Sequence, residues 1–285
     1  MSLNSFDTLL EFLAAYPDQH ARGTPFYRFV DSLVKEAFHE AQPAFAAGQP
    51  VPMAEFGMLT LPYEKMGAID SIDLFGLDEL LMFAFYYRNK GRYARAADIG
   101  ANLGLHTILL SMSGCKVEAF EPDPEHHEKL LRNLKLNNIT DAIAHKAAVS
   151  EQNGQMQFVR VLGNTTSSHL AGAKANPYGE LDKFDVNVMD IREIVQRVDL
   201  MKIDAEGHEA VILHAIPIAD WNHVDAFVEV GTPENALAVF NTFAGTQVNI
   251  FAQKSGWKRV ENLAGMPISY KEGGIFISAK TEMPW

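Results

Sequence analysis

The spacing of apolar residues divides the chain into two unequal parts. In residues 5–16 and 25–45, apolar side chains recur every three or four positions, which predicts two amphipathic helices. Residues 56–63 add a short run typical of a strand. We therefore expect an N-terminal helical cap with a short strand over residues 1–75, followed by a second domain over residues 76–285.

In the larger part, short apolar runs alternate with amphipathic segments. The apolar runs predict strands at residues 92–100, 116–122, 142–150, 198–204 and 224–230. The amphipathic segments predict helices at residues 77–90, 103–113, 123–138, 206–215 and 233–246. Residues 151–185 are expected to be irregular apart from a strand at 155–161, and residues 258–263 and 273–280 to form a terminal antiparallel hairpin. The alternation predicts an α/β fold with a doubly wound parallel sheet, which binds ligands at the carboxyl ends of its strands.

Composition narrows the class of partner. The chain of 285 residues is 47% apolar, enough for one sizeable core. Its 36 acidic and 24 basic side chains give a formal charge of -12, so no overall positive field attracts nucleic acid. No window approaches the ~18 apolar residues of a membrane span. The single Cys115 forms no internal disulfide and the N-terminus has no secretory signal pattern, so we expect a cytoplasmic protein.

The segment AADIGANLGLHT, residues 96–107, places a glycine turn between a predicted strand and a predicted helix. Glycine lets backbone N–H groups approach a ligand, and the helix offers the partial positive charge of its N-terminus. A dinucleotide-binding turn carries glycines at relative positions one, three and six, whereas here Gly100 is followed by Asn102 and Leu105 at those positions. The Lys-Ser/Thr pair of a phosphate-binding loop does not follow either. The turn therefore indicates another ligand.

Two acids stand beside this turn at the ends of successive predicted strands. Asp98 precedes the turn, and Glu121 closes the next strand. Asp98 could bind an ammonium group, the N–H groups of the turn a carboxylate, and Glu121 two ribose hydroxyls. S-adenosylmethionine has all three features. Acids beside glycine turns also occur in nucleotide-binding proteins, so the spacing leaves both ligands open.

Six segments follow one another over most of residues 96–231. They read DIGANLGLHT, FEPDPEHHEKLLRNLKLNN, AAVSEQNGQMQF, TSSHL, LMKIDAEGHEAVIL and VDAFVEV. In their order and residues they resemble the FkbM-type family of S-adenosylmethionine-dependent methyltransferases. The resemblance implies a Rossmann-like class I methyltransferase sheet, S-adenosyl-L-methionine as cofactor, and O-methylation of a hydroxyl on a sugar or natural-product acceptor.

The resemblance also implies positions for seven residues around the cofactor. These are Asp98, Gly100, Asn102 and Gly104 at the methionine end, Glu121 at the ribose, Ala147 beside the adenine and Asp204 near the transferred methyl group. One departure concerns the acid that closes a later strand. Many relatives have a histidine soon after this acid, whereas Glu229 is followed by Val230 and Gly231, so the resemblance assigns it no role.

The segment KIDAEGHE, residues 202–209, gathers the candidate catalytic residues Asp204, Glu206 and His208 where a predicted strand becomes a helix. An acceptor hydroxyl needs a base, and His208 is our candidate because the reference pKa of histidine, about 6.5, suits proton removal near neutrality. The alternative is that Glu206 and Glu209 only stabilise the helix N-terminus and His208 is solvated. We expect no metal, although Asp204 and Glu206 could instead hold a divalent cation.

Several other side chains have a structural alternative to a functional role. His106 either covers the cofactor or approaches the substrate, and His126 and His127 are expected to face solvent. Seven aromatic residues at helical spacing are expected in the core rather than in a substrate wall: Phe26, Tyr27, Phe29, Phe83, Phe85, Tyr86 and Tyr87. No Asp- or Asn-Pro-Pro-aromatic motif follows residues 198–204, which argues against amide or adenine amino groups as acceptors.

Two other functional classes remain open. One is a non-catalytic cofactor-binding or scaffold module of the same fold, although a silent site has no physical need for both acids and both glycines. The other is a nicotinamide-dependent oxidoreductase, which the glycine spacing weakens. Binding of nicotinamide without binding of S-adenosylmethionine would favour the second class.

Overall fold

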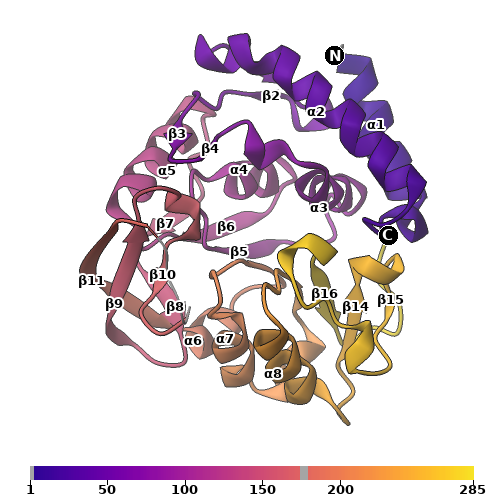
Figure 1. Ribbon diagram of the computed structural model, residues 1–285, viewed down its shortest axis with the longest axis vertical. Coiled ribbons are helices and arrows are strands. Elements are labelled where there is room, and N and C mark those ends of the chain that lie inside the picture. Colours follow the sequence, from indigo (N-terminus) through magenta and orange to yellow (C-terminus); the bar gives the residue numbers. More distant parts are fainter. Residues whose placement is uncertain (1–2, 174–178) are drawn as a thin grey trace.

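The computed structural model describes residues 3–173 and 179–285, and a mixed β-sheet forms its centre (Figure 1). Within the described residues this sheet has eight strands in the order β15-β14-β16-β13-β12-β5-β6-β7. Their bounds are β5 Arg95–Ile99, β6 Lys116–Phe120, β7 Ile143–His145, β12 Leu200–Ile203, β13 Asp225–Val228, β14 Asn249–Ala252, β15 Lys258–Arg259 and β16 Ile275–Ser278. Five neighbouring strands of this sheet run parallel to one another, namely β13, β12, β5, β6 and β7. Strand β16 is antiparallel to both of its neighbours, β13 and β14.

The direction in which the chain adds strands to the sheet reverses at β5. After β5 the chain continues to β6 and β7 on one side, and it later returns to add β12 on the other side of β5. Every residue of β12 and β13 is buried, as expected for strands covered on both faces. The carboxyl ends of β5, β6 and β12 meet at this reversal, which is where open α/β sheets bind ligands. The predicted doubly wound α/β class is confirmed.

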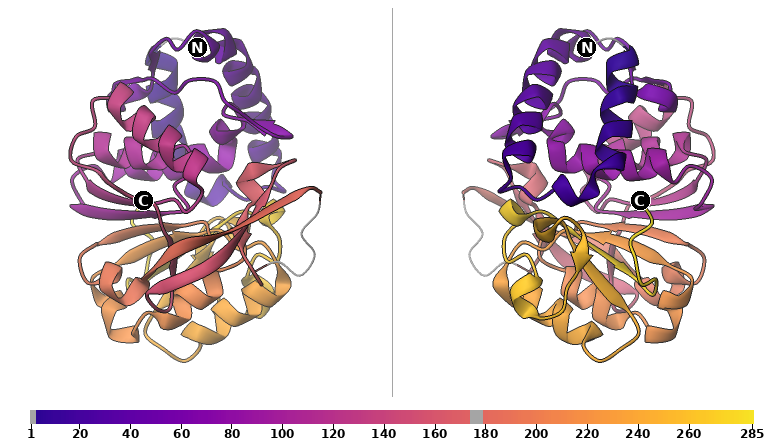
Figure 2. Two further views of the ribbon diagram at one scale, coloured as in Figure 1. Left: turned by 90° about the vertical axis from the view of Figure 1, so that its left-hand side faces the viewer. Right: turned by 90° about the vertical axis from the view of Figure 1, so that its right-hand side faces the viewer.

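Helices cover both faces of the sheet (Figures 1 and 2). One face carries α3 (Leu77–Arg88), α4 (Leu105–Met112) and α5 (Pro124–Leu136). The other carries α6 (Ile191–Val195), α7 (Glu209–Ala215) and α8 (Pro233–Phe243). Asp123 caps α5 by accepting hydrogen bonds from the N–H groups of Glu125 and His126 at 2.8 and 3.3 Å.

Two N-terminal helices form a further layer over α3 (Figure 1). They are α1 (Leu3–Ala15) and α2 (Pro25–Ala46), which confirms both predicted helices. Thr24 caps α2, since its Oγ1 accepts a hydrogen bond from the N–H of Tyr27 at 3.1 Å. Two short hairpins follow, one of β1 (Val51–Pro52) and β2 (Met58–Leu59), the other of β3 (Lys65–Met66) and β4 (Ile69–Asp70).

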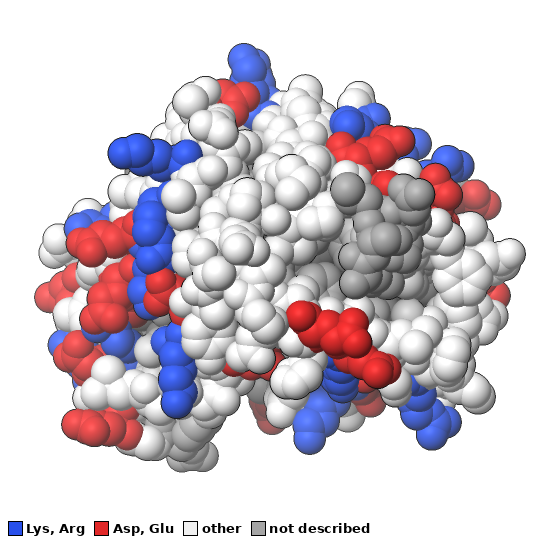
Figure 3. Space-filling view, turned by 90° about the horizontal axis from the view of Figure 1, so that it is seen from above, with Lys and Arg blue, Asp and Glu red and all other residues white. Residues whose placement is uncertain are grey.

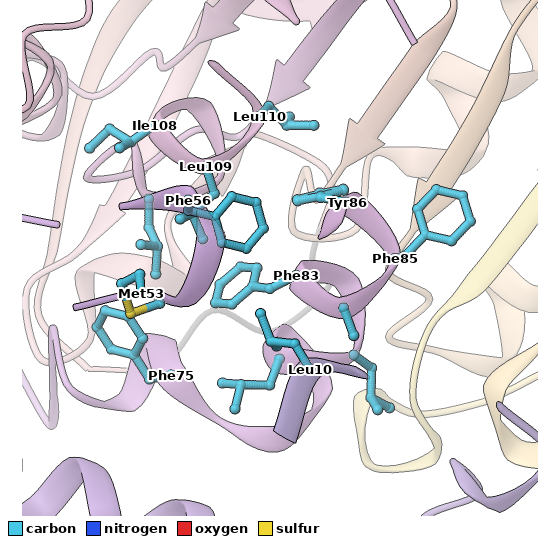
Figure 4. Close-up of a cluster of buried hydrophobic side chains, with 14 of the residues drawn as sticks. Leu10, Met53, Phe56, Phe75, Phe83, Phe85, Tyr86, Ile108, Leu109 and Leu110 are labelled. Carbon is cyan, nitrogen blue, oxygen red and sulfur yellow. The ribbon is translucent and has the colours of Figure 1, made fainter. Parts of the chain in front are cut away.

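A single apolar cluster joins this N-terminal layer to the sheet. Leu10 of α1, Phe83 of α3 and Leu109 of α4 lie together in it (Figure 4). The ring of Phe56 meets that of Tyr87 in α3 edge to face, with their centroids 6.3 Å apart. The core is therefore continuous between the two parts of the chain, and the division near residue 75 stays a prediction.

A second sheet lies beside the first, with strands in the order β10-β9-β11-β8. Their bounds are β8 Ala148–Ser150, β9 Gly154–Val161, β10 His169–Leu170 and β11 Leu181–Asp190. The strand predicted at residues 155–161 is confirmed, but the expectation of irregular structure around it is wrong. In β11 the apolar residues Phe184, Val186 and Val188 alternate with polar ones, so that one face packs into a small cluster with Phe158.

The predicted terminal hairpin is wrong in its pairing. β15 pairs with β14, and β16 lies between β13 and β14, so residues 258–263 and 273–280 do not meet. β14 itself was not predicted, because its four residues are all buried and show no alternation. Residues 142–150, expected as one strand, divide between β7 in the central sheet and β8 in the second.

The face seen in Figure 3 carries its charged side chains mainly at the margins, where Lys and Arg are interspersed with Asp and Glu. Of the helices in residues 3–173 and 179–285, none combines the length and the apolar character needed to cross a bilayer.

Candidate functional site

A cavity of about 650 Å³ opens where the strand order of the central sheet reverses. Sites for small molecules commonly have volumes of about 300–1,000 Å³. Its wall includes Gly100 and Asn102 after β5, Glu121 after β6, and Asp204 and Glu206 after β12. The structure thus brings five of the predicted site residues to one space.

Backbone conformation explains the two glycines of the turn. Gly100 has a φ of +76°, and a Cβ atom there would lie 1.9 Å from the carbonyl oxygen of Asp204. Gly104 has a φ of +84°, and a Cβ atom there would lie 2.2 Å from Cδ1 of Leu130. Only glycine lets the turn pack against both neighbours in this left-handed conformation.

The N–H groups of the turn are engaged within the protein. Those of Gly100 and Ala101 donate to the carbonyl oxygen of Phe120 at 3.0 and 3.1 Å. The N–H of Asn102 donates to Oε2 of Glu121 at 2.8 Å. The idea that these three groups bind a carboxylate therefore has no support in this geometry.

Asp98 is completely buried behind the turn, off the cavity wall formed by the described residues. Its Oδ2 accepts a hydrogen bond from Oγ1 of Thr107 at 2.6 Å. Within the described part of the chain, its Oδ1 has no hydrogen-bond partner, and Nζ of Lys202 lies 4.0 Å away. A buried carboxylate oxygen in this state is satisfied by a cation or by a water that bridges to one.

Glu121 is buried at the cavity wall, and both of its carboxylate oxygens accept hydrogen bonds from the backbone. Oε1 accepts from the N–H of Asp123 and Oε2 from that of Asn102, each at 2.8 Å. Burial raises the pKa of Glu121 to about 8, although both N–H donors oppose the shift. Each oxygen keeps a further lone pair with which to accept a hydroxyl.

The second sheet supplies the apolar wall opposite Glu121. Ala148, Val149 and Phe158 line the cavity there, whereas Ala147, the residue predicted beside the adenine, is buried just off the wall. Bidentate hydrogen bonds hold this sheet in place, since Nε and Nη2 of Arg160 in β9 donate to the carboxylate of Asp123 at 2.6 and 2.7 Å.

Asp204 is half-buried at the wall, where Lys202 sets its charge. Nζ of Lys202 lies 3.3 Å from Oδ2 of Asp204 and donates to the carbonyl oxygen of Gly100 at 3.2 Å. Burial opposes the charge of Lys202, but Asp204 and Asp98 outweigh it and raise the lysine pKa. Burial would raise the pKa of Asp204, but the charge of Lys202 and its hydrogen bond to Oδ2 lower it. Asp204 is therefore ionised at neutral pH.

The loop after Asp204 is held by Glu209 rather than by His208. Oε1 of Glu209 accepts hydrogen bonds from the N–H groups of Ala205 and Gly207 at 2.8 and 3.1 Å. Glu206 faces the cavity with a φ of +51°. Among the residues described, no group of three or more His, Cys, Asp or Glu side chains is arranged to hold a metal ion.

His208 does not lie on the cavity wall formed by the described residues. Its buried ring forms a 2.8 Å hydrogen bond between Nε2 and Oγ of Ser150, and burial lowers its pKa. The geometry gives no support to His208 as the general base. The alternative of a solvated His208 is wrong as well. Strand β8 of the second sheet, which ends at Ser150, packs against the ring and covers it.

The N-terminal part of the chain closes one side of the cavity. Arg22, Asp73 and Leu74 lie on its wall. Nη2 of Arg22 pairs with Asp78 at 2.6 Å, and Nη1 donates to the carbonyl oxygen of Tyr270 at 2.9 Å. The sequence carried no signal for the contact between Arg22 and Tyr270, because these residues are 248 positions apart.

The three other histidines considered in the sequence analysis are buried. His126 and His127, expected to face solvent, are buried, and Nε2 of His126 meets Oγ1 of Thr165 at 3.0 Å on the cavity wall. His106 lies off the cavity wall that the described residues form, in a core position. Its ring is held between Tyr86 and Glu79 at 3.0 and 2.7 Å.

The aromatic residues are mostly core residues, as predicted. Tyr27, Phe83, Phe85 and Tyr86 are buried, whereas Phe29 is 64% exposed. A signal that could have revealed a further site residue is Lys202, a lone charge inside the apolar run LMKI. Lysine is rarely fully buried without a partner, so its position implies a nearby acid.

The mixed sheet, with β16 inserted antiparallel between β13 and β14, has the fold of class I S-adenosylmethionine-dependent methyltransferases, and the acids and the glycine turn lie at its carboxyl edge. Residues 98–242, a little over half of the chain, match the methyltransferase FkbM domain. The chain belongs to this family.

Two curated relatives are identical to the chain at about a quarter of the aligned positions. It is 24% identical over 156 residues to "Methyltransferase 1" of Beauveria bassiana, covering 46% of this chain and 61% of that protein. It is 26% identical over 173 residues to "Methyltransferase sdnD" of Sordaria araneosa, covering 48% and 66%. The matches span less than two thirds of either relative. Among solved structures, an O-methyltransferase from Bacillus cereus in complex with SAH is 12% identical with a TM-score of 0.39, covering 87% of this chain and 95% of that one.

Proposed function

We propose that this protein transfers a methyl group from S-adenosylmethionine to a hydroxyl group on a sugar or natural-product acceptor. The observation that carries the proposal is that Gly100, Asn102 and Glu121 share one cavity with the ionised Asp204. Membership of the FkbM family supports the reaction class. The hydroxyl acceptor rests on the family resemblance and on the absence of the motif that presents amides and adenine amino groups.

The residues present fit this cofactor. Glu121 offers free lone pairs for two ribose hydroxyls, and Val149 and Phe158 offer apolar surface for an adenine ring. Oδ1 of Asp98 accepts no hydrogen bond within the described residues, which supports an ammonium group reached through a bridging water. The close packing of Gly100 against Asp204 supports an acceptor end beside the glycine turn.

When bound, S-adenosylmethionine supplies a methyl group on a positively charged sulfur, which keeps the electron pair of the broken carbon–sulfur bond. Asp204 takes the hydroxyl proton in this proposal, because its ionised carboxylate stands at the cavity wall. Glu206, on the same wall, binds a second hydroxyl of the acceptor. His208 has no part in the proton transfer.

Binding and transfer test the proposal separately. Isothermal calorimetry on the purified protein should detect S-adenosylmethionine and its demethylated product, and should detect no binding of NAD. A screen with labelled cofactor against sugars, glycolipid precursors and macrolides then identifies the acceptor. Binding of NAD without binding of S-adenosylmethionine would refute the proposal, and binding without transfer to any hydroxyl would favour a non-catalytic module.

A further inference from the structure

Arg160 in β9 carries a buried charge that the proposed reaction does not use. The residue is 8% exposed and lies off the cavity wall formed by the described residues. Its guanidinium group donates two hydrogen bonds to the carboxylate of Asp123, from Nε at 2.6 Å and from Nη2 at 2.7 Å. Nη1 donates to Oε1 of Glu125 at 2.7 Å. Asp123 is itself 1% exposed, so its ion pair with Arg160 is only weakly screened by solvent.

This ion pair connects two cavity residues to which the proposed function gives the ribose and the adenine of the cofactor. On one side, the N–H of Asp123 donates to Oε1 of Glu121 at 2.8 Å. On the other, Phe158 precedes Arg160 by two positions in β9, so both side chains lie on the same face of that strand. Glu121 and Phe158 both line the cavity. A shift of Arg160 is therefore transmitted to both of them.

Aromatic contacts strengthen the link between Arg160 and Phe158. The guanidinium carbon of Arg160 lies 5.0 Å from the centroid of the Phe184 ring, within the range of a cation–π contact. The centroid of the Phe184 ring lies in turn 5.6 Å from that of Phe158. The two phenylalanines are also direct partners in the pairing of β11 with β9. The guanidinium group and the two rings thus form one packed series that ends at the cavity.

A second contact joins α5 to the second sheet. Nε2 of His126 in α5 meets Oγ1 of Thr165 at 3.0 Å, and both residues line the cavity. This contact is a single hydrogen bond, whereas Arg160 holds Asp123 by two charge-assisted bonds, which are shorter and stronger. Arg160 therefore makes the stronger of these two contacts.

Stability alone gives no reason for a charge at this position. A buried ion pair is seldom more stabilising than apolar side chains of similar volume, because both charges lose their hydration. Its particular property is geometry, since the planar guanidinium group binds a carboxylate in one plane and one orientation. The bidentate pair thus restricts how the second sheet can move relative to the segment that carries Glu121.

We propose that Arg160 is a positioning residue for the cofactor. Its bidentate bond to Asp123 fixes the separation between Glu121 and Phe158, and this separation admits the ribose and the adenine ring together. Arg160 itself does not touch the cofactor and takes no part in the proton transfer. This inference rests on the proposed methyltransferase function.

Arg160→Lys tests the geometry without removing the charge. Lysine keeps a cation beside Asp123 but lacks the planar fork, so the protein should stay folded while the separation between Glu121 and Phe158 is no longer fixed. In calorimetric titrations, the affinity for the demethylated cofactor should fall by roughly 10–10²-fold, within the range of coupling between residues in contact. The unfolding temperature should stay close to that of the parent.

Arg197→Lys is the matched control. Nε and Nη2 of Arg197 donate to the carboxylate of Glu118 at 2.5 and 2.9 Å, in the same bidentate arrangement. Neither residue lines the cavity as the described part of the chain forms it. This variant should bind the demethylated cofactor with the parent's affinity. An equal loss in both lysine variants would overturn the proposal, because the effect would then belong to any bidentate pair.

The double variant Asp123→Asn/Arg160→Met separates positioning from stability. Asparagine still caps α5, and neither position keeps a buried charge, so the unfolding temperature should stay close to the parent's. Cofactor affinity should nevertheless be at least as low as in Arg160→Lys, because the bidentate bond is absent. Parent-like affinity in the double variant or in Arg160→Lys would refute the positioning role. A parent protein that does not bind the cofactor would instead refute the proposed function.

Discussion

Lys202 places one positive charge between two carboxylates at the centre of the site. Its Nζ lies 3.3 Å from Asp204 and 4.0 Å from the completely buried Asp98. Removal of one member of a buried ion pair leaves the other charge uncompensated, which costs about 3–5 kcal/mol. Lys202→Met should therefore lower the free energy of unfolding by ~3–5 kcal/mol in urea titrations.

Lys254→Met is the matched control for this prediction. Its Nζ pairs with Glu272 at 2.9 Å, with 27% and 35% of the two side chains exposed. Exposed ion pairs contribute at most about 1 kcal/mol. Equal losses from the two substitutions would show that Lys202 is not the buried counter-ion described here.

Glu121 should make cofactor affinity depend on pH. The carboxyl group is protonated below its pKa of about 8, and ribose hydroxyls that donate to it favour the ionised form, so that binding releases a proton. Affinity should rise with pH up to about 8 and then level off. In calorimetric titrations, Glu121→Gln should remove this dependence and weaken binding by ~1–3 kcal/mol.

The control for this effect is Glu128→Gln, at an exposed position of α5, the helix that follows Glu121 in the chain. It should leave both the affinity and its pH dependence unchanged. A Glu121→Gln variant with the parent's pH dependence would remove Glu121 from the ribose site.

At the residue scale, the site residues that could be predicted from the sequence are those that directly follow a strand of the parallel sheet. Glu121 and Asp204 directly follow strands, and parallel strands bring their carboxyl ends to one edge of the sheet. The fate of His208 could not be predicted, because it depends on Ser150 in a second sheet.

Among the elements, the turn after β5 packs directly against the loop that carries Asp204. Gly100→Ala adds a Cβ atom 1.9 Å from the carbonyl oxygen of Asp204, so the loop that carries Asp204 has to shift. We expect this variant to lose most of its cofactor affinity in calorimetric titrations and to unfold at a lower temperature.

Gly91→Ala provides a control with the same backbone penalty. Gly91 has a φ of +79° but no atom within 4 Å of the added Cβ. It should lose only the ~1–2 kcal/mol of a left-handed alanine and keep full cofactor affinity. If Gly100→Ala behaved in the same way, the contact between the turn and Asp204 would have no functional weight.

Most elements of the central sheet could be predicted, because helical and strand periods alternate clearly in residues 76–246. The elements that were missed have weak local signals. β11 has a single narrow apolar face of Phe184, Val186 and Val188, and β14 has four buried residues without alternation. The pairing of β16 between β13 and β14 is a long-range choice that no local pattern encodes.

At the scale of the whole molecule, the N-terminal layer shares its core with the sheet. The ring of Phe56 lies against that of Tyr87 of α3, and Leu10 of α1 lies in the same cluster as Phe83 and Leu109. Residues 76–285 alone would expose these apolar surfaces, so we expect this fragment to aggregate or to lack cooperative thermal unfolding. A fragment that unfolds cooperatively near the temperature of the full chain would instead support an independent domain beginning near residue 76.

The central claim, methyl transfer from S-adenosylmethionine with Asp204 as proton acceptor, is tested most directly by single-turnover transfer of a labelled methyl group to an acceptor found in the screen. The parent should label a hydroxyl oxygen, Asp204→Asn should be slower by roughly 10²–10⁴-fold, and His208→Ala should stay close to the parent. Transfer that is unaffected in Asp204→Asn but lost in His208→Ala, or a parent that binds the cofactor and labels no hydroxyl, would contradict the account.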